Sequence, residues 1–449
     1  ILTKSPALDK FEASGQVDLG LTPTVDAFRQ RYNGMINVPI VDDKLAFRAV
    51  GFYRHEEGFL DNIGTGIDNS NTLKAYGGRA TLLFKPIDDL SIRLLVSHEN
   101  SEPQDSSLRN PALGKFVRRS NRPDLFQGKM TNYNLTLDFD LGFANFTSAT
   151  TYSDYSASFT VDLAGTYAQA FPFALDADGH DDTFVQETRL ASASGGSFDW
   201  VVGSWFFSKR RDVDYGYRTT LEFLAARNLT GLPDEYYQRF GAHFKSTEMA
   251  AFGELTYRFS DKFWLTGGLR YGSTEIQGFT EPGGYNATYN FLGTNYSYLA
   301  IALFNFRNIP LTLTPVPAAV GQKVQDDKLS YKASASFKPS QNLTTYATIA
   351  TGFRTPVVNA RAGLAPPATS PNDIVIPDGA GSDKVVNYEI GLKGSWLNGR
   401  LNANVAAYWI DWSNIQVQAN RVSDAVQFAT NIGKAVSKGI EVEIAARPL

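Results

Sequence analysis

Residues 132–141 read Asn-Tyr-Asn-Leu-Thr-Leu-Asp-Phe-Asp-Leu, in which polar and apolar side chains alternate without a break. A period of two is typical of a β-strand with one polar face and one apolar face. The same alternation recurs in residues 11–21, 329–338 and 401–409. No stretch has a helical period of comparable quality, so the sequence predicts an all-β fold.

About sixteen such strands can be placed along the chain. We expect them near residues 10–21, 29–41, 45–56, 74–85, 90–101, 130–140, 143–155, 183–193, 198–211, 246–259, 263–275, 329–338, 343–352, 385–395, 401–412 and 434–446. Every second connection is a tight turn rich in Gly, Asp, Asn, Pro and Ser, for example residues 42–44 and 397–400. The connections between them are long, except the first at about 22–28, and those at 212–245 and 276–328 are the longest.

This alternation of short and long connections predicts a meander of hairpins with all tight turns at one end. Several long loops without secondary structure are uncommon in a compact soluble domain. They are typical of an outer-membrane β-barrel, which has short periplasmic turns and long extracellular loops. Strands of roughly 10–13 residues are also long enough to cross a thin bilayer at a tilt. We therefore expect an antiparallel transmembrane β-barrel, in which closure satisfies the backbone hydrogen bonds in lipid.

The composition excludes several other classes of protein. The 449 residues include no cysteine, which rules out a disulfide framework, a Cys-zinc site and an iron–sulfur protein. A net charge of -4 argues against a nucleic-acid partner, because such proteins normally carry a basic surplus. The 31 Phe, 21 Tyr and 6 Trp favour strands and membrane interfaces. The longest apolar run, about residues 298–304, is far too short for a membrane-spanning helix.

Three stretches in the last quarter of the chain carry a family resemblance. A predicted strand runs into Gly-Phe-Arg-Thr-Pro at 352–356, and Glu-Ile-Gly-Leu-Lys follows at 389–393 before an aromatic strand at 406–415. Asn-Ile-Gly at 431–433 then precedes Gly-Ile-Glu-Val-Glu at 439–443. In order and spacing these stretches resemble the TonB-dependent outer-membrane receptors, with weaker matches at 37–62 and 265–271.

The resemblance implies a barrel of about 22 strands around a globular plug. We expect residues 1–8 to be the end of the plug or its linker and residues 9–449 to be barrel, with the plug and about six further strands outside this sequence. The implied function is uptake of a scarce ligand across the outer membrane of a Gram-negative bacterium. The implied partners are the TonB–ExbB–ExbD energy-coupling complex, acting through the plug, and the lipids of that membrane. Neither enzymatic activity nor a cofactor is expected.

The ligand surface would lie on the long loops. The ligand would be a siderophore–iron complex, a vitamin, a carbohydrate or a similar molecule. Aromatic rings suit sugars and ring-bearing chelates, and arginine suits anionic ones. Our candidates are Tyr236, Tyr237, Arg239, Tyr285, Tyr296, Tyr298, Arg354, Asn359 and Arg361. For each of them the alternative is packing of loop on loop or contact with lipid headgroups.

The sequence shows no catalytic constellation and predicts no metal site. His55, His98, His180 and His243 are scattered over predicted loops and strand ends, without a His-x-x-x-His pair. The tripeptide at 180–182, His-Asp-Asp, could bind a metal, but an exposed loop tip is the favoured interpretation.

Two other functions remain open at this point. A passive sixteen-stranded porin would form a closed barrel from these strands alone. An adhesin or soluble β-protein would be stable in buffer without detergent.

Overall fold

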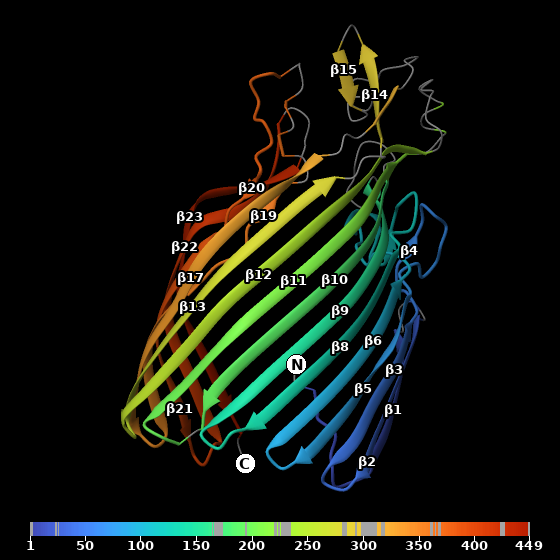
Figure 1. Ribbon diagram of the computed structural model, residues 1–449. Helices are drawn as coiled ribbons and strands as arrows, with labels where there is room; N and C mark the ends of the chain where they lie inside the picture. Colours follow the sequence, from blue (N-terminus) through green and yellow to red (C-terminus); the bar gives the residue numbers. More distant parts are fainter. Residues whose placement is uncertain are drawn as a thin grey trace.

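The computed structural model shows one long, curved antiparallel sheet that follows the chain strand by strand (Figure 1). The structure describes residues 3–22, 25, 27–163, 165, 174–193, 195–219, 222, 225, 235–280, 285–291, 294–297, 312–315, 319–359, 362–363, 365–366, 370–422 and 427–447. None of the helices among these residues is long and apolar enough to cross a membrane.

Sixteen strands build the wall. They are β1 (Glu12–Thr22), β2 (Ala27–Val41), β3 (Leu45–Glu56), β5 (Leu73–Ile87), β6 (Leu90–Pro103), β8 (Phe126–Asp140), β9 (Ala144–Asp162), β10 (Ala174–Ser192), β11 (Phe198–Arg218), β12 (Tyr236–Ser260), β13 (Phe263–Thr280), β17 (Ala319–Ser340), β18 (Leu343–Gly352), β21 (Lys384–Trp396), β22 (Leu401–Asn420) and β23 (Gln427–Ala446). The sheet counts nineteen strands because β14 (Tyr285–Phe291), β15 (Thr294–Ser297) and β16 (Thr312–Pro315) extend from it between β13 and β17.

All sixteen predicted wall strands are present, so the all-β meander is confirmed. The main difference is length on the side of the long loops. The strand predicted at 246–259 runs from Tyr236 to Ser260, and the one predicted at 183–193 begins at Ala174. In these extensions polar side chains stand on both faces, so the alternation that marks a half-buried strand disappears.

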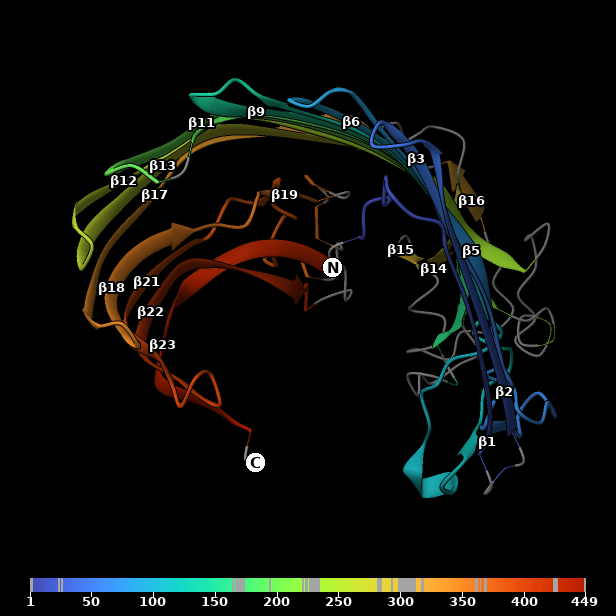
Figure 2. The same cartoon turned by 90° about the horizontal axis from the view of Figure 1, so that it is seen from below.

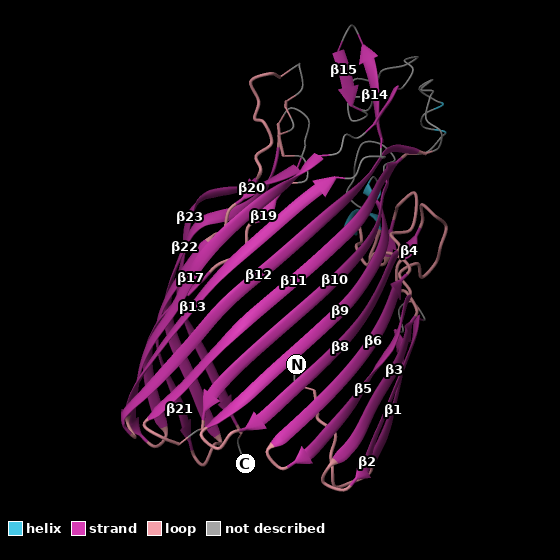
Figure 3. Ribbon diagram, viewed as in Figure 1, coloured by secondary structure: helices cyan, strands magenta, loops and turns pink. Residues whose placement is uncertain are grey.

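Each wall strand pairs with the next one along the chain. The turns after β2, β5, β8, β10, β12, β17 and β21 all lie at one end of the sheet, at the bottom of Figure 1. The other connections lie at the opposite end, where most are long but those at 23–26 and 421–426 are short. We call these the turn end and the loop end. Figure 3 shows that strands fill almost the whole height between them.

The sheet curves through most of a circle but does not close on itself (Figure 2). No pairing joins β23 to β1 among the residues that the structure describes, and both of these strands are described in full. These residues therefore do not form the closed sixteen-stranded barrel that the porin alternative predicts.

Asn37 on β2 identifies the concave face. Its side chain bonds to the main chain of Ala7 and Lys10, in a segment that lies inside the curve (Figure 2). Paired residues share a face and successive residues alternate, so this face can be followed strand by strand. It carries the polar set of most strands, including the ion pair between Arg48 and Glu12 at 3.1 Å, whereas β11 places Val201, Trp205 and Phe207 on it.

The convex face carries the apolar set, flanked by two rows of aromatic rings. On the loop side of the apolar band, the ring centres of Tyr32 and Tyr53 on neighbouring strands lie 6.3 Å apart. On the turn side, those of Phe198 and Tyr257 lie 6.5 Å apart. An apolar band between two aromatic rows is the outer surface of a membrane barrel.

Many aromatic residues near strand ends, which in the sequence suggest interfacial rows, belong to these rows only in part. Tyr53, Phe84, Tyr152, Tyr257, Phe259, Phe263 and Trp409 stand on the convex face, whereas Phe52, Tyr155, Trp264, Tyr408 and Trp412 have the register of the concave face. Alternation places consecutive aromatic residues on opposite faces, so a cluster in the sequence cannot lie in one row.

Candidate functional site

The loop end is the candidate site, and two of its connections and the end of β9 form one buried polar core. Arg118 donates to Asp105 at 2.5 Å and to Asp124 at 3.1 Å. Asn62 donates to Asp105 at 3.0 Å and to Ser120 at 2.6 Å. The carboxylate of Asp105 and the guanidinium of Arg118 are almost completely buried. Buried charges are tolerated when they are paired and hydrogen-bonded in this way.

The end of strand β9 also belongs to this core. Asp162 at its end accepts the N–H of Arg122 at 3.2 Å, and its own N–H donates to Asp124 at 2.7 Å. A two-residue parallel pairing of β4 (Asp61–Asn62) with β7 (Val117–Arg118) joins the two connections. We call Asn62, Asp105, Arg118, Ser120, Asp124 and Asp162 the loop core. It makes this part of the loop end a folded unit.

A second folded unit lies inside the curve at the loop end, between β13 and β23. Residues 353–383, which we call the strut, contain the pairing of β19 (Val357–Val358) with β20 (Gly379–Ala380). Figure 2 shows β19 inside the curve of the wall. A Cβ placed on Gly278 of β13 would lie 3.0 Å from Val358, so the strut touches that strand.

Asn359 holds the other side of the strut to β23. Its amide donates to the carbonyl of Ala429 at 2.9 Å and accepts the N–H of the same residue at 2.7 Å. It also donates to the carbonyl of Pro377 at 3.0 Å. The side chain was predicted to be near the ligand, but here it is buried and its hydrogen bonds connect the strut to the wall.

Arg354, a second predicted ligand residue, is bonded to the fully buried Asp383. Its main-chain N–H and its Nε donate to Asp383 at 2.8 Å and 2.6 Å, and its Nη2 donates to the carbonyl of Gln416 at 3.1 Å. Trp412 donates to the same carboxylate at 2.9 Å, and its ring lies 5.0 Å from the guanidinium carbon. Half of the Arg354 side chain remains exposed, so the residue can still face a ligand.

Burial raises the pKa of Asp383, but the hydrogen bonds from Arg354 and Trp412 outweigh it, and the net pKa is lowered. A lowered carboxyl pKa stabilises the folded state above the ordinary value near 4, and this contribution is lost as the pH falls through the lowered value. We therefore expect hydrogen exchange in peptides from 353–383, corrected for intrinsic rates, to lose protection as the pH falls below about 4. Asp383→Asn should be weakly protected at every pH. Equal protection of both proteins across this range would contradict the assignment.

Tyr236 and Arg239, at the start of β12, pack on each other. The Arg239 guanidinium carbon lies 3.9 Å from the centre of the Tyr236 ring, and the Tyr236 hydroxyl donates to Asp176 at 2.8 Å. A Cβ on Gly216 would lie 2.5 Å from that ring, so the glycine makes room for it. Asp176 and Gly216 have the register of the convex face, away from the mouth.

The aromatic cluster that faces the mouth was missed. Tyr215 on β11 pairs with Phe240 on β12, and their ring centres lie 5.2 Å apart. Tyr217 stacks on the same Phe240 ring at 6.5 Å. All three have the register of the concave face. The sequence predicts a strand that ends at residue 211 and a loop from 212, whereas β11 continues to Arg218 and its alternation defines this face.

The remaining candidates are less completely placed. Tyr285 and Tyr296 lie on β14 and β15, which pair with each other beyond the wall. Tyr237 lies on β12, and nothing further is described of its side chain. Tyr298 and Arg361 lie outside the described residues. The structure thus brings Arg354 and Asn359 together on the strut and leaves Tyr236 and Arg239 on another part of the loop end.

The assignment of His180 to a loop tip was wrong. His180 lies within β10, which is paired with β9 on one side and β11 on the other. The polar residues around it interrupted the alternation, which is why the sequence suggested a loop.

Comparison with known proteins supports the fold and identifies the family. Residues 98–447 match the family model described as TonB dependent receptor-like, beta-barrel. The chain belongs to this family. The family consists of receptors rather than enzymes and lies in the outer membrane, as the sequence predicted.

Individual relatives of this receptor chain are more distant. The pesticin receptor of Yersinia enterocolitica is 23% identical over 438 residues, which is 93% of this chain and 54% of that protein. The ferric yersiniabactin uptake receptor FyuA of Yersinia pestis has a TM-score of 0.70 at 18% identity, over 98% of this chain and 59% of that chain. The siderophore receptor PiuA of Acinetobacter baumannii has a TM-score of 0.67 at 17% identity, over 98% and 62%. The receptor chain therefore spans just over half the length of these relatives.

Proposed function

We propose that this chain is the barrel wall of an outer-membrane receptor that takes up a ferric chelate of the siderophore type. The aromatic cluster of Tyr215, Tyr217 and Phe240 on the concave face at the mouth carries the proposal. Aromatic rings at the rim of a wide lumen suit a ring-bearing chelate, and the half-exposed Arg354 suits its negative charge. Several structural relatives are named as siderophore receptors.

Energy would come from the TonB–ExbB–ExbD complex, acting through a plug in the lumen. In this proposal residues 1–8 lead from the plug into the barrel and residues 9–449 belong to the barrel wall. The position of residues 3–10 inside the curve, bonded to Asn37, supports this division. The loop candidates Tyr237, Tyr285, Tyr296, Tyr298 and Arg361 remain proposed ligand contacts.

The test is growth and uptake in a strain that lacks the complete gene. We expect the strain to lose growth on one or a few of a panel of ferric chelates in iron-limited medium, and the complete gene to restore it. Restoration should require a working TonB. Unchanged growth and uptake on every ferric chelate, or uptake without TonB, would contradict the proposal.

Phe240→Ala tests the mouth directly. Loss of one ring from an aromatic contact surface should weaken chelate binding about tenfold, measured on the purified receptor by fluorescence quenching or calorimetry. The matched control is Phe184→Ala, which removes an equally large ring from the convex face. Equal affinities of the two variants for the chelate would show that the ligand does not bind at this cluster.

A further inference from the structure

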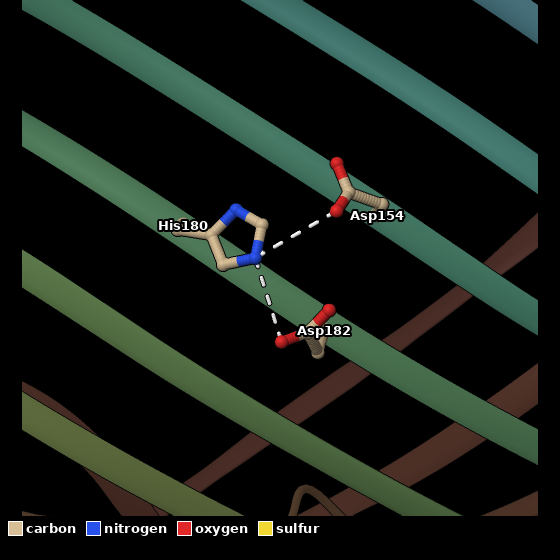
Figure 4. A group of neighbouring side chains, drawn as sticks. All are labelled: Asp154, His180 and Asp182. Atoms are coloured by element: carbon tan, nitrogen blue, oxygen red, sulfur yellow. Dashed lines mark ion pairs between the residues drawn. The ribbon is translucent and has the colours of Figure 1, made fainter.

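Three side chains on the outer surface converge on one point. They are Asp154 of β9 and His180 and Asp182 of β10 (Figure 4). The Nε2 of His180 lies 3.4 Å from Asp182 and 3.7 Å from Asp154. One ligand atom from each residue falls within 4.8 Å of the other two, and within the described part of the chain no other group of three His, Cys, Asp or Glu does so.

The register explains why they meet. Asp154 is paired directly with Asp182, and His180 stands two residues further along on the same face. This is the convex face, because Asp154 and Asp182 alternate with residues of the concave set. Tyr152 and Phe184, two residues toward the turn end, belong to the aromatic row on the loop side of the apolar band. The three side chains therefore lie at the level of the lipid headgroups.

The carboxylates lack the cation that such a pair needs. Like charges directly opposite each other on neighbouring strands repel. Among the described residues no lysine or arginine forms an ion pair with Asp154 or Asp182. Arg210, the partner of Asp182 on β11, is bonded to Asp212 at 2.9 Å instead. A histidine offsets this repulsion only when it is protonated.

Neighbouring hydroxyls orient the ligand atoms. The Oγ of Ser156 lies 3.2 Å from the Nδ1 of His180, and the hydroxyl of Tyr152 donates to the Oδ1 of Asp182 at 2.5 Å. These contacts occupy the far side of each group and leave the Nε2 of His180 and the Oδ2 of Asp182 facing each other. Outer hydrogen bonds of this kind fix the ligands of protein metal sites.

We propose that Asp154, His180 and Asp182 bind a divalent transition-metal ion, with zinc as the representative member. Imidazole with carboxylates is a ligand set that suits zinc and its neighbours rather than magnesium or calcium. Two donors about 2.1 Å from a tetrahedral ion lie about 3.4 Å apart, close to the two nitrogen–oxygen separations found here. The fourth position faces outward, since each side chain is between 37% and 44% exposed. The ion would cross-link β9 to β10, and the inference does not depend on the proposed uptake function.

Zinc titration of the complete receptor in detergent, stripped with a chelator, tests the proposal at pH 7.5. The wild type should bind one more zinc ion than His180→Gln, and Asp154→Asn should bind that ion at least tenfold more weakly. The matched control is His98→Gln, which removes a convex-face histidine that contacts Thr131 and belongs to no such group. It should keep the wild-type stoichiometry.

A second measurement does not depend on how many other zinc sites the receptor has. Without metal, the double variant Asp154→Asn and Asp182→Asn should be at least as heat-stable as the wild type, because the repulsion is gone. With zinc, only the wild type and His98→Gln should gain a higher unfolding temperature. Equal zinc binding and equal zinc-dependent stabilisation in His180→Gln and the wild type would overturn the site. Binding only at millimolar zinc would also overturn the proposed site, and the three side chains would then be a His–Asp ion-pair network.

Discussion

Asp105→Ala is expected to unfold the loop core and leave the barrel wall intact. Asp105 accepts hydrogen bonds from Arg118, Asn62 and the main-chain N–H groups of Ser106 and Asp124. Removing one partner of a buried ion pair costs about 3–5 kcal/mol, because the other charge stays buried without compensation. The strand pairings of the wall do not involve this carboxylate, so the loss should be local.

Limited trypsin digestion of outer membranes measures this effect. The sequence from 104 to 125 contains four trypsin cleavage sites, Arg109, Lys115, Arg118 and Arg119. In the variant we expect rapid cleavage there, while the barrel keeps its folded mobility on unheated gels. Asp88→Ala, an exposed aspartate in a short turn, is the control and should resist trypsin like the wild type. Resistance of Asp105→Ala would show that the loop core does not depend on the ion pair.

A disulfide between position 278 and position 358 should form almost completely and tie the strut to β13. A Cβ on Gly278 would lie 3.0 Å from a methyl carbon of Val358, so the two Cβ atoms can be at most about 4.5 Å apart, within the range of disulfides. The 449 residues include no cysteine, so Gly278→Cys and Val358→Cys introduce the only two thiols among them. Export through an oxidising compartment favours bond formation.

The cross-link is read as a mobility shift on non-reducing gels that disappears with a reductant. The control pair combines Val358→Cys with Gly34→Cys on β2, where an added Cβ would meet nothing within 4 Å. It should remain reduced. A disulfide in the control pair, or none in the test pair, would show that the strut does not lie against β13 as described.

The wall could be predicted from the sequence because lipid and lumen impose opposite polarity on successive residues. Outside the apolar band successive residues no longer need opposite polarity, so the sequence does not mark the strand there. For this reason β12 begins at Tyr236, ten residues before the expected start. The bulge between Tyr217 and Arg218 also shifts the register there, so the faces of Tyr236 and Arg239 could not be read from the spacing.

The site was predicted less well because its contacts join distant residues. Asn359 and Ala429 are 70 residues apart, and Arg354 and Asp383 are 29 apart. No local pattern in the sequence marks such partners. The motif around Arg354 did carry information, because this residue attaches the strut to the wall. The proposed zinc site could not be read from the sequence for the same reason, since only the register of β9 and β10 brings Asp154 to His180.

The loop core constrains how this receptor can be re-engineered or can diverge. Its side chains come from the connection after β3, the connection after β6 and the end of β9. Grafting any one of these segments from a relative would bring in residues that lack their bonding partners. Functional chimaeras should therefore tolerate exchange of all three segments as a block and reject exchange of one. We therefore expect these three segments to be exchanged together among related receptors, and not one at a time.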